Sequence, residues 1–295
     1  ALRMKGETVE EITGSARVMR EMAVRIHVND RMVVDTCGTG GDRMNTFNIS
    51  TTAAFVVAGA GVTVAKHGNR SVSSSCGSAD VLKALGVKID IPPDKVEECL
   101  NTIGIGFLFA PLYHGAMKHA AAPRQEIGIR TLFNILGPLT NPAGASIQVV
   151  GVYDRDLSDR LAQVLVKLGT QHCFCVSGLD GLDEITITGR SKICEGREGK
   201  VKCFYIEPSQ FDLPTAKVKD IAGGTPEQNA QIMMEVLSGQ KGPRRDVVLL
   251  NAAPALMGAG KAATLQEGVK LAAASIDQGS AREKLERLKA MTNRP

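Results

Sequence analysis

The chain has 295 residues, a formal net charge of +4, 43% hydrophobic residues and 22% charged residues. This composition predicts a globular protein with a substantial core and argues against disorder. No apolar run approaches the roughly 18 to 20 residues that a membrane-spanning helix needs, so we expect no membrane partner. Lys and Arg are mixed with Asp and Glu, Trp is absent and only three tyrosines occur, which argues against nucleic acid as a partner.

The first half of the chain alternates between helical and strand patterns. Residues 7–26 have apolar side chains at helical spacing, and residues 32–35 form a short apolar strand that runs into a glycine-rich segment at 38–42. The elements expected next are a helix at 50–60, a strand at 62–65, a helix that begins at Ser78 and a strand near 87–91. Such alternation predicts a parallel α/β sheet.

The second half continues this pattern and ends in helices. Residues 93–122 look mainly helical, and a helix at 157–168 lies between strand patterns. Those strands are expected at 147–153, 172–177 and 184–188. Segments 191–196 and 200–206 predict a hairpin attached to the main sheet, and the last 70 residues are largely helical, with Thr225 as a cap before Pro226.

The seven cysteines are odd in number, contain no CxxC pair and lie mostly in apolar stretches. They are Cys37, Cys76, Cys99, Cys173, Cys175, Cys194 and Cys203. We therefore expect reduced, buried thiols in preference to a disulfide or zinc framework.

The most informative segment reads DTCGTGGD at 35–42 and is followed by TFNIST at 46–51. Glycines let backbone amides approach phosphate oxygens closely, and a helix N-terminus adds unpaired donors with a favourable dipole. The alternative is a tight turn before an ordinary helix cap. The segment matches neither the P-loop nor the GxGxxG pattern, so it predicts a phosphate site only together with a partner motif.

That partner motif is KHGNR at 66–70, with several serines behind it as far as Ser78. The carboxyl ends of neighbouring parallel strands share one crevice, so both loops are expected to face the same ligand. A lysine, an arginine and nearby hydroxyls favour an anion site over a solvated basic turn.

Together, several motifs resemble those of the anthranilate phosphoribosyltransferase family along the whole chain. They are GTGGD, NIST at 48–51, KHGNR, RTLFNILGPLTNP at 130–142, GLDE at 181–184 and NAAPAL at 251–256. The resemblance implies a large α/β domain with a mainly parallel central sheet, of the nucleoside phosphorylase-like kind, plus a small helical domain built from separated segments. The small domain would take 1–29 and 92–121, and the large domain 30–91 and 122–295.

The same resemblance implies transfer of the phosphoribosyl group from phosphoribosyl pyrophosphate to anthranilate, with Mg²⁺, in tryptophan biosynthesis. The residues implied for phosphoribosyl pyrophosphate are Gly38, Gly41, Asp42, Thr46, Asn48, Ser50, Thr51, Lys66 and Ser78. Those implied for anthranilate are Gly38, His67, Asn69, His114, Arg124 and Gly137. Those implied for the metal are Ser50, Asp183 and Glu184. A homodimer in the cytoplasm, or in a plastid after loss of a transit segment, is also expected.

Elementary chemistry agrees with the metal assignment. The neighbouring carboxylates of Asp183 and Glu184 would repel each other and the substrate unless a cation such as Mg²⁺ lay between them. Taken alone, the two residues would be an ordinary acidic turn. An arylamine needs no deprotonation before attack, so no catalytic base is certain and His67 is a weak candidate.

Two features depart from the family pattern. Gly115 follows His114 where the family commonly has proline, so a looser loop is expected beside the acceptor. The family also usually has more helical turns before the segment that matches 1–8, so we expect the N-terminal part of the small domain to be missing. Two other readings remain: a pyrimidine nucleoside phosphorylase of the same fold, and a non-catalytic nucleic-acid-binding relative.

Overall fold

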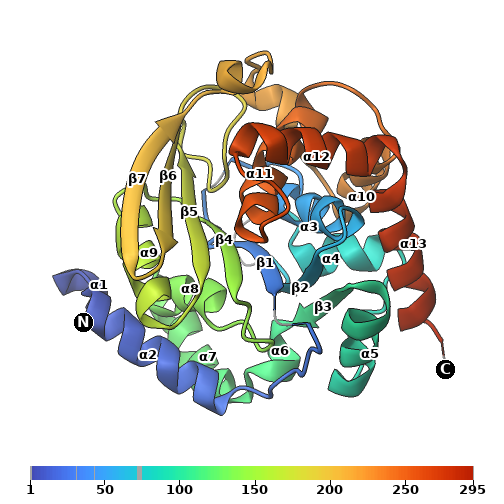
Figure 1. The fold of residues 1–295 in the computed structure, drawn as a ribbon. Coiled ribbons are helices and arrows are strands. Elements are labelled where there is room, and N and C mark those ends of the chain that lie inside the picture. Colours follow the sequence, from blue (N-terminus) through green and yellow to red (C-terminus); the bar gives the residue numbers. More distant parts are fainter. Residues whose placement is uncertain (1, 31, 43, 72–74, 295) are drawn as a thin grey trace.

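A computed structural model of the chain contains a seven-stranded sheet in the order β3-β2-β1-β4-β5-β6-β7 (Figure 1). It describes residues 2–30, 32–42, 44–71 and 75–294, without the side chains of 121, 122, 124, 125 and 127. The parallel strands are β1 (Val33–Gly38), β2 (Thr63–Gly68), β3 (Ile105–Phe109), β4 (Ile147–Gly151) and β5 (His172–Gly178). An antiparallel hairpin of β6 (Ser191–Arg197) and β7 (Lys200–Ile206) extends the sheet beyond β5. The predicted mainly parallel sheet with an attached hairpin is confirmed.

One face of the sheet is covered by a layer of helices, coloured from blue and cyan to orange and red in Figure 1. They are α3 (Ile49–Gly59), α4 (Ser78–Ala84), α10 (Pro226–Leu237), α11 (Pro243–Gly258), α12 (Leu265–Asp277) and α13 (Ser280–Thr292). Helix α3 is buried along most of its length because it packs against the sheet, α11 and α13. This layer and the sheet enclose the larger core, and burial of its apolar side chains is the main term that stabilises the fold.

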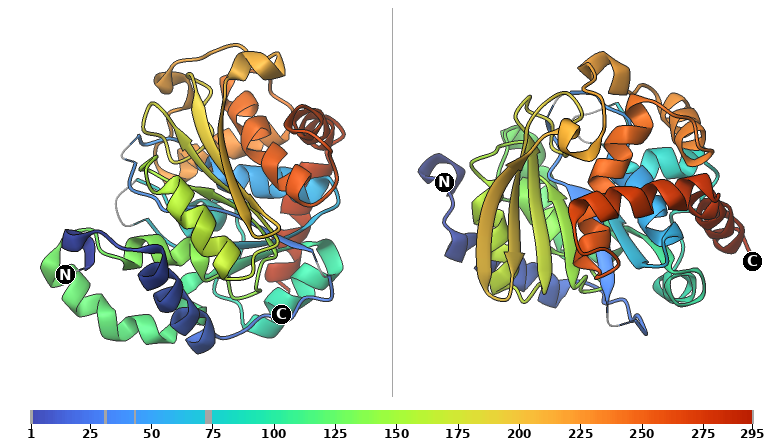
Figure 2. Two further views of the ribbon diagram at one scale, coloured as in Figure 1. Left: turned by 60° about the vertical axis from the view of Figure 1, so that its left-hand side comes forward. Right: turned by 45° about the horizontal axis from the view of Figure 1, so that its top comes forward.

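The opposite face carries α9 (Ser158–Lys167) against β5, β6 and β7, with α2 (Val9–Met22) packed on α9 (Figure 2). Helix α2 begins at Thr8 because the Thr8 hydroxyl accepts the Glu11 amide and the Glu11 carboxylate accepts the Thr8 amide. The remaining helices are α1 (Leu2–Lys5), α5 (Pro93–Ile103), α6 (Ala110–Tyr113), α7 (Lys118–Ile127) and α8 (Phe133–Leu136). Short 3₁₀ turns are η1 (Gly115–Met117), η2 (Gly137–Leu139), η3 (Pro208–Phe211) and η4 (Val218–Ile221).

Two predicted strands are wrong. Residues 87–91 bury alternate side chains, as a strand does, but they pair with no strand, and the amide of Lys88 donates to the Thr292 hydroxyl of α13 instead. In segment 184–188 side chains take the backbone hydrogen bonds: the Ile185 amide donates to Asn251 Oδ1 and the Thr186 amide to Ser191 Oγ. Burial pattern alone therefore cannot distinguish a strand from an extended segment that is held by side chains.

The prediction for 93–122 missed β3, the strand at the edge of the sheet next to β2. All five residues of β3 are buried, and this apolar run between two helices has the composition of a buried helix as much as that of a parallel strand. The proposed division into domains stays a prediction, and β3, which lies inside its 92–121 segment, belongs to the sheet.

The cysteine prediction is wrong for one pair. Cys194 of β6 and Cys203 of β7 form a disulfide, because directly opposite residues of an antiparallel pair lie close enough to bridge. The Cα atoms of the two residues are 4.1 Å apart. The other five cysteines are buried thiols, as expected.

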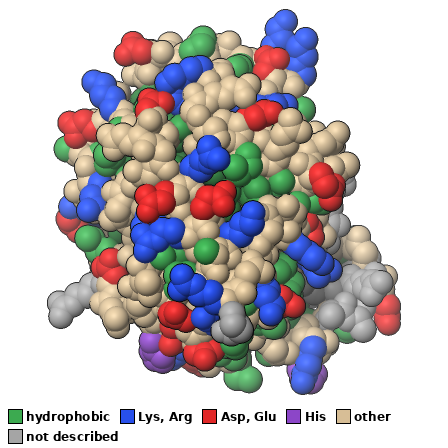
Figure 3. Space-filling model, turned by 90° about the vertical axis from the view of Figure 1, so that its right-hand side faces the viewer, with side chains coloured by type: hydrophobic (Ala, Val, Ile, Leu, Met, Phe, Trp, Pro, Cys, Tyr) green, Lys and Arg blue, Asp and Glu red, His purple; other side chains and the backbone are tan. Residues whose placement is uncertain are grey.

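The surface agrees with the charge pattern of the sequence. On the face shown in Figure 3, Lys and Arg side chains alternate with Asp and Glu and form no continuous basic stripe. Within the described residues, no helix combines the length and the apolar character that crossing a membrane requires.

Candidate active site

Most of the predicted site residues lie at the carboxyl edge of the parallel strands. The chain leaves β1 toward β2 and β3 on one side, whereas β4 and β5 lie on the other side of β1, so the strand order reverses between β1 and β4. Open α/β sheets bind ligands in the crevice at such a reversal. The glycine-rich loop follows β1 at this edge, Lys66 and His67 lie near the end of β2, and the acidic pair follows β5.

The glycine-rich loop contacts the acidic pair directly. The Gly40 amide donates to Asp183 Oδ2 at 2.8 Å. A β-carbon on Gly38 would lie 2.8 Å from the same oxygen, and one on Gly151 would collide with the Asp183 carbonyl, so glycine at both strand ends admits Asp183. Gly40 and Gly41 have φ values of +67° and +80°, in the left-handed region that favours glycine. The structure therefore brings together the loop and the carboxylates.

The N-terminus of α3 meets Glu184. The Ser50 amide donates to Glu184 Oε1 at 3.1 Å, and the Ser50 carbonyl accepts the Thr36 hydroxyl at 2.9 Å. The Ser50 hydroxyl makes no hydrogen bond to a described residue, so it is available to a ligand. Thr51, the next residue, is buried.

Asn48 and its neighbours close the other side of this helix end. The Asn48 side chain donates to the Cys76 carbonyl and accepts from Asn229, and it does not cap α3. Thr46 pairs with Ala222 through an isolated bridge. Ser78 begins α4 and its hydroxyl donates to the Asn69 carbonyl at 3.2 Å.

Lys66 supplies a buried cation to the site. Its side chain is only 4% exposed, and Nζ donates to the Thr36 carbonyl of β1. Burial raises the pKa of both Asp35 and Glu184, and the positive charge of Lys66, which faces these acids, offsets part of each rise. Arg70, from the same motif, is exposed instead and lies 5.9 Å from the ring centre of Phe109.

Negative charge nevertheless dominates at the loop. Burial raises the pKa of Asp183, and the adjacent carboxylate of Asp42 raises it further. Burial and then Asp183 raise the pKa of Glu184 well above its usual range, and Lys66 offsets only part of this rise. Asp42 Oδ2 is buried without a hydrogen-bond donor from the described residues. Such a cluster is stabilised by a cation.

The donor set fits Mg²⁺. The described residues contain no group of three His, Cys, Asp or Glu side chains that would hold a metal alone. Mg²⁺ commonly uses one or two carboxylates and takes its other ligands from water and substrate phosphates. Asp183 and Glu184, with the Ser50 hydroxyl beside them, provide this incomplete oxygen set.

The predicted acceptor residues include two buried histidines. His67 of β2 and His114 after α6 are 5% and 7% exposed, and their Nε2 atoms lie 3.2 Å apart. Burial, then His114 and Lys66, lower the pKa of His67 to about 3, and burial also lowers the pKa of His114. Both rings are therefore neutral near pH 7, and one Nε2 donates a proton to the other.

Among the other predicted acceptor residues, Gly137 has open space beside it. A β-carbon on Gly137 or on Gly115 would meet no atom within 4 Å, so both positions leave room. Asn69 is exposed at the end of the β2 loop. The Arg124 side chain lies outside the described residues. His119 is exposed on α7.

Comparison with known proteins decides the family. Residues 30–282 match the family model described as "Glycosyl transferase family, a/b domain". The anthranilate phosphoribosyltransferase of Moorella thermoacetica is 60% identical over 290 residues, which cover 98% of this chain and 86% of the relative. That of Symbiobacterium thermophilum is 58% identical, and the match covers 100% of this chain and 86% of the relative. The chain belongs to the anthranilate phosphoribosyltransferase family.

Solved structures of this glycosyltransferase family agree with the fold. The anthranilate phosphoribosyltransferase of Thermus thermophilus superposes with a TM-score of 0.94 at 43% identity, and the match covers 99% of this chain and 88% of that one. The Saccharomyces cerevisiae enzyme in complex with PRPP and Mg superposes with a TM-score of 0.90 at 31% identity, and the match covers 99% of this chain and 82% of that one. Neither alternative reading, the nucleoside phosphorylase or the nucleic-acid-binding relative, is supported by these family members.

Two residues that contact the predicted site were not expected from the sequence. Asp35 is fully buried in β1, where Oδ1 accepts the His67 amide at 3.1 Å and Oδ2 has no donor from the described residues. A charged residue inside an apolar strand was the available signal. Arg130 donates to the Gly41 carbonyl from 89 positions further along the chain, which no local pattern reveals.

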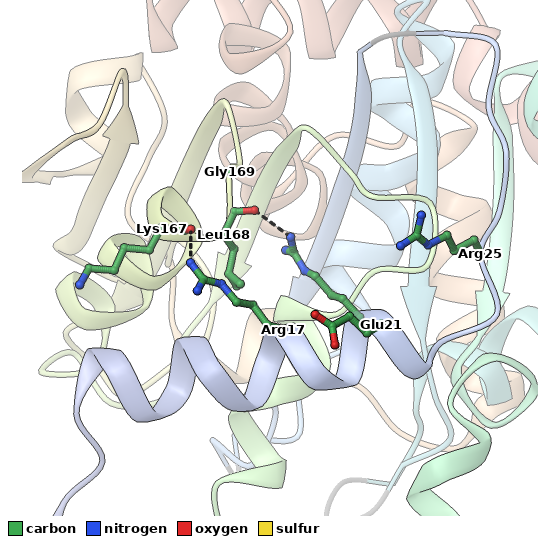
Figure 4. A pocket seen from close by; sticks show the side chains of 7 residues that line it. Arg17, Glu21, Arg25, Lys167, Leu168 and Gly169 are labelled. Carbon is green, nitrogen blue, oxygen red and sulfur yellow. Dashed lines mark hydrogen bonds between the residues drawn. The ribbon is translucent and has the colours of Figure 1, made fainter.

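Two depressions lie on the surface of the described residues. One of about 360 Å³ lies at the ends of β4 and β5, beside Tyr153, Gly178 and Gly181, and so borders the site. The other, of about 380 Å³, lies between α2 and the end of α9 (Figure 4). There Arg17 and Arg20 donate to the Lys167 and Leu168 carbonyls. Cations at the last carbonyls of a helix are ordinary structural caps, so this second depression has a structural explanation.

Proposed function

We propose that this chain transfers the phosphoribosyl group of phosphoribosyl pyrophosphate to anthranilate, giving N-(5-phosphoribosyl)anthranilate and pyrophosphate. The reaction would be a step of tryptophan biosynthesis. The observation that carries the proposal is the contact between the glycine-rich loop and Asp183, which unites phosphate-binding backbone and metal-binding carboxylates at one edge of the sheet. Family membership supplies the identity of the two substrates.

The donor would lie across the loop after β1 and the N-terminus of α3. Gly38, Gly41, Asp42, Asn48, Ser50 and Thr51 would line it, with Thr46, Lys66 and Ser78 at its margins. Backbone amides and the helix dipole favour its phosphates. Mg²⁺ held by Asp183, Glu184 and Ser50 would neutralise the pyrophosphate as charge develops on it.

The acceptor would enter between the end of β2 and the turn at Gly137. Asn69 would orient the amine and Arg124 would pair with the carboxylate, while the neutral rings of His67 and His114 would form a wall. An anthranilate carboxylate beside uncharged imidazoles must find its positive partner elsewhere, which favours Arg124. Gly137 would let the aromatic ring approach the backbone.

Catalysis would depend on alignment and charge more than on a base. The amine attacks C1 of the ribose as pyrophosphate leaves, with oxocarbenium character and inversion, and the site stabilises the leaving group. Because the pKa of His67 is about 3, it stays unprotonated through the working pH range. It is a weak base, which suffices only for the acidic proton of an arylammonium product.

We also propose a homodimer and the cytoplasm as its location. Relatives with 58 to 60% identity come from bacteria, which gives no support to a plastid. The division into a small domain of 1–29 and 92–121 and a large domain of the remainder also belongs to this proposal.

One assay tests the reaction directly. The protein is incubated with phosphoribosyl pyrophosphate, Mg²⁺ and anthranilate, and the loss of anthranilate fluorescence is followed with and without EDTA. We expect a loss that requires both the donor and Mg²⁺. A folded protein that shows no Mg²⁺-dependent loss would reject the function. Arg124→Ala should raise KM for anthranilate more than that for the donor, and an equal rise would reject the division of the site.

A further inference from the structure

Arg130 fastens the glycine-rich loop to the sheet. It is half-buried, its guanidinium lies over the ring of Tyr153 with Cζ 4.1 Å from the ring centre, and Nη2 donates to the Gly41 carbonyl. The Tyr153 amide in turn donates to the Thr39 hydroxyl at 3.3 Å. Arg130 and Tyr153 thus contact the loop at two points from segments outside it.

The contact fixes the direction of one peptide group. In a trans peptide the C=O and the following N–H point in opposite directions, so an arginine that holds the Gly41 carbonyl also aims the Asp42 amide away from itself. The Thr39 amide is occupied by the Gly151 carbonyl, and the Gly40 amide by Asp183. Among the described residues, the Gly41 and Asp42 amides donate to no acceptor, so they remain available to a ligand.

The packing leaves no room for another residue at position 41. A β-carbon on Gly41 would lie 2.9 Å from Arg130 Cζ and closer still to Nη2. Gly41 is also in the left-handed region, with φ of +80°. The absence of a side chain is therefore required both by the backbone conformation and by the approach of Arg130.

We propose that Arg130 is a positioning residue for the donor: supported by the Tyr153 ring, it holds the Gly41–Asp42 peptide so that the free Asp42 amide, next to that of Gly41, faces a diphosphate. The inference rests on the proposed function for the identity of that diphosphate. Arg130 also begins the segment 130–142 that contains Gly137. The clamp therefore joins the donor loop to the acceptor side of the site, and it acts through the backbone, without contact to the reacting atoms.

Arg130 could instead act only as a positive charge near the phosphates, and Arg155 provides the matched control. Arg155 borders the same depression as Tyr153 and its side chain is 63% exposed; among the described residues, that side chain makes only a 3.9 Å ion pair with Asp156. Arg155→Met removes one charge from this region without touching Gly41. Arg130→Met removes both the charge and the hydrogen bond.

The first experiment measures the loop without any substrate. Hydrogen exchange of the peptide that spans 38–42 is compared in the wild type, Arg130→Met, Arg130→Lys and Arg155→Met. We expect faster exchange in Arg130→Met, partial protection in Arg130→Lys, since an ammonium donates but does not stack as a planar group, and wild-type exchange in Arg155→Met. Unchanged exchange in Arg130→Met would overturn the clamp, whether or not the protein turns over anthranilate.

The second experiment titrates phosphoribosyl pyrophosphate with Mg²⁺ by calorimetry in the absence of anthranilate. Loss of a hydrogen bond to a charged group, about 1.5 kcal/mol, corresponds to at least about tenfold weaker binding in Arg130→Met. At saturating donor, KM for anthranilate should change far less. If Arg155→Met weakened donor binding as much as Arg130→Met does, Arg130 would act only as a positive charge. If Arg130→Met weakened the use of both substrates equally and also lowered Tm, the role of Arg130 would be structural. Wild-type protein that binds the donor but fails to turn over would refute the function and leave the clamp standing.

Tyr153→Leu supplies a variant that keeps the guanidinium. It removes the ring beneath Arg130, while the backbone amide that donates to Thr39 remains. We expect an intermediate loss of donor affinity, and the double variant with Arg130→Met should be no weaker than Arg130→Met alone. Additive losses would show that the two residues act separately and would overturn the proposed support.

Discussion

Glu184→Gln should make the ligand-free protein more stable while abolishing most of its turnover. Glutamine keeps an oxygen that can accept the Ser50 amide, so the hydrogen bond at 3.1 Å survives and only the charge is removed. That charge is unfavourable in the free protein, because Glu184 is buried beside Asp183 and its pKa is raised. The proposed Mg²⁺ site requires the same charge.

The size of the gain follows from the arrangement of charges. Two unit charges about 4 Å apart in a medium of effective dielectric about 20 interact by about 4 kcal/mol. Asp183 is half-buried and Lys66 offsets part of the repulsion, so we expect about 1 to 2 kcal/mol to be released at pH 8. For a chain of this size, that raises Tm by roughly 2 to 4 °C.

The stability gained in Glu184→Gln should depend on pH, and the direction of this dependence can be predicted. A carboxyl whose pKa is higher in the folded state destabilises the fold increasingly as pH rises from its unfolded value through its folded value. Below the unfolded value the wild-type carboxyl is protonated in both states and resembles the amide. The Tm difference between variant and wild type should therefore be near zero at acidic pH and grow toward pH 8.

Calorimetry over a pH series measures this difference, and Glu195→Gln is the control with the opposite sign. Glu195 lies 2.7 Å from His172, and the hydrogen bond with His172 lowers the pKa of Glu195. Loss of the Glu195 charge should lower the free energy of unfolding at neutral pH. This effect should fade as pH falls through the lowered pKa that Glu195 has in the folded state. A Glu184→Gln protein that is less stable at pH 8, or equally shifted at all pH values, would refute the repulsion argument.

Three further changes test other parts of the structure. Gly38→Ala places a β-carbon 2.8 Å from Asp183 Oδ2, so it should weaken Mg²⁺-dependent donor binding by about tenfold or more in calorimetry, whereas Gly14→Ala, at an exposed position of α2 with open space around it, should leave binding unchanged. Cys203→Ser removes the β6–β7 disulfide and should lower stability by about 2 to 3 kcal/mol in non-reducing denaturant titration, with turnover retained; an unchanged midpoint would mean that the bond is absent in solution. The acid limb of the pH profile of kcat/KM should follow protonation of Asp183 and Glu184, since the pKa of His67 is about 3. His67→Asn should therefore leave that limb in place. If the limb disappeared in this variant, it would belong to His67.

Sequence patterns predicted which segments come together at the candidate site because these segments are local motifs that occur at strand ends. GTGGD and KHGNR each signal a loop, and the geometry of a parallel sheet requires loops after adjacent strands to meet. To predict that Gly40 lies next to Asp183, one must also assume that the acidic pair follows a strand. The predicted strand at 184–188 was wrong, yet β5 ends at Gly178 and delivers the pair to the same edge.

The parts that escaped prediction depend on distant partners. Asn251 accepts the Ile185 amide across 66 positions, and this bond replaces the strand pairing that the apolar alternation suggested. Cys194 and Cys203 became opposite residues only once the register of the hairpin was fixed. Each feature is set by tertiary packing, on which the local composition of the chain carries no information.

The arrangement of charges explains why this edge is suited to a diphosphate and a cation together. Asp42, Asp183 and Glu184 concentrate negative charge beside amides and Lys66, which favour anions. A phosphate alone would be repelled by the carboxylates, and a cation alone would face Lys66 and the positive end of the α3 dipole. The site is electrostatically satisfied only when both are present, so the two should bind with positive cooperativity. Glu184→Gln should reduce that cooperativity more than it reduces the affinity for the donor measured without metal.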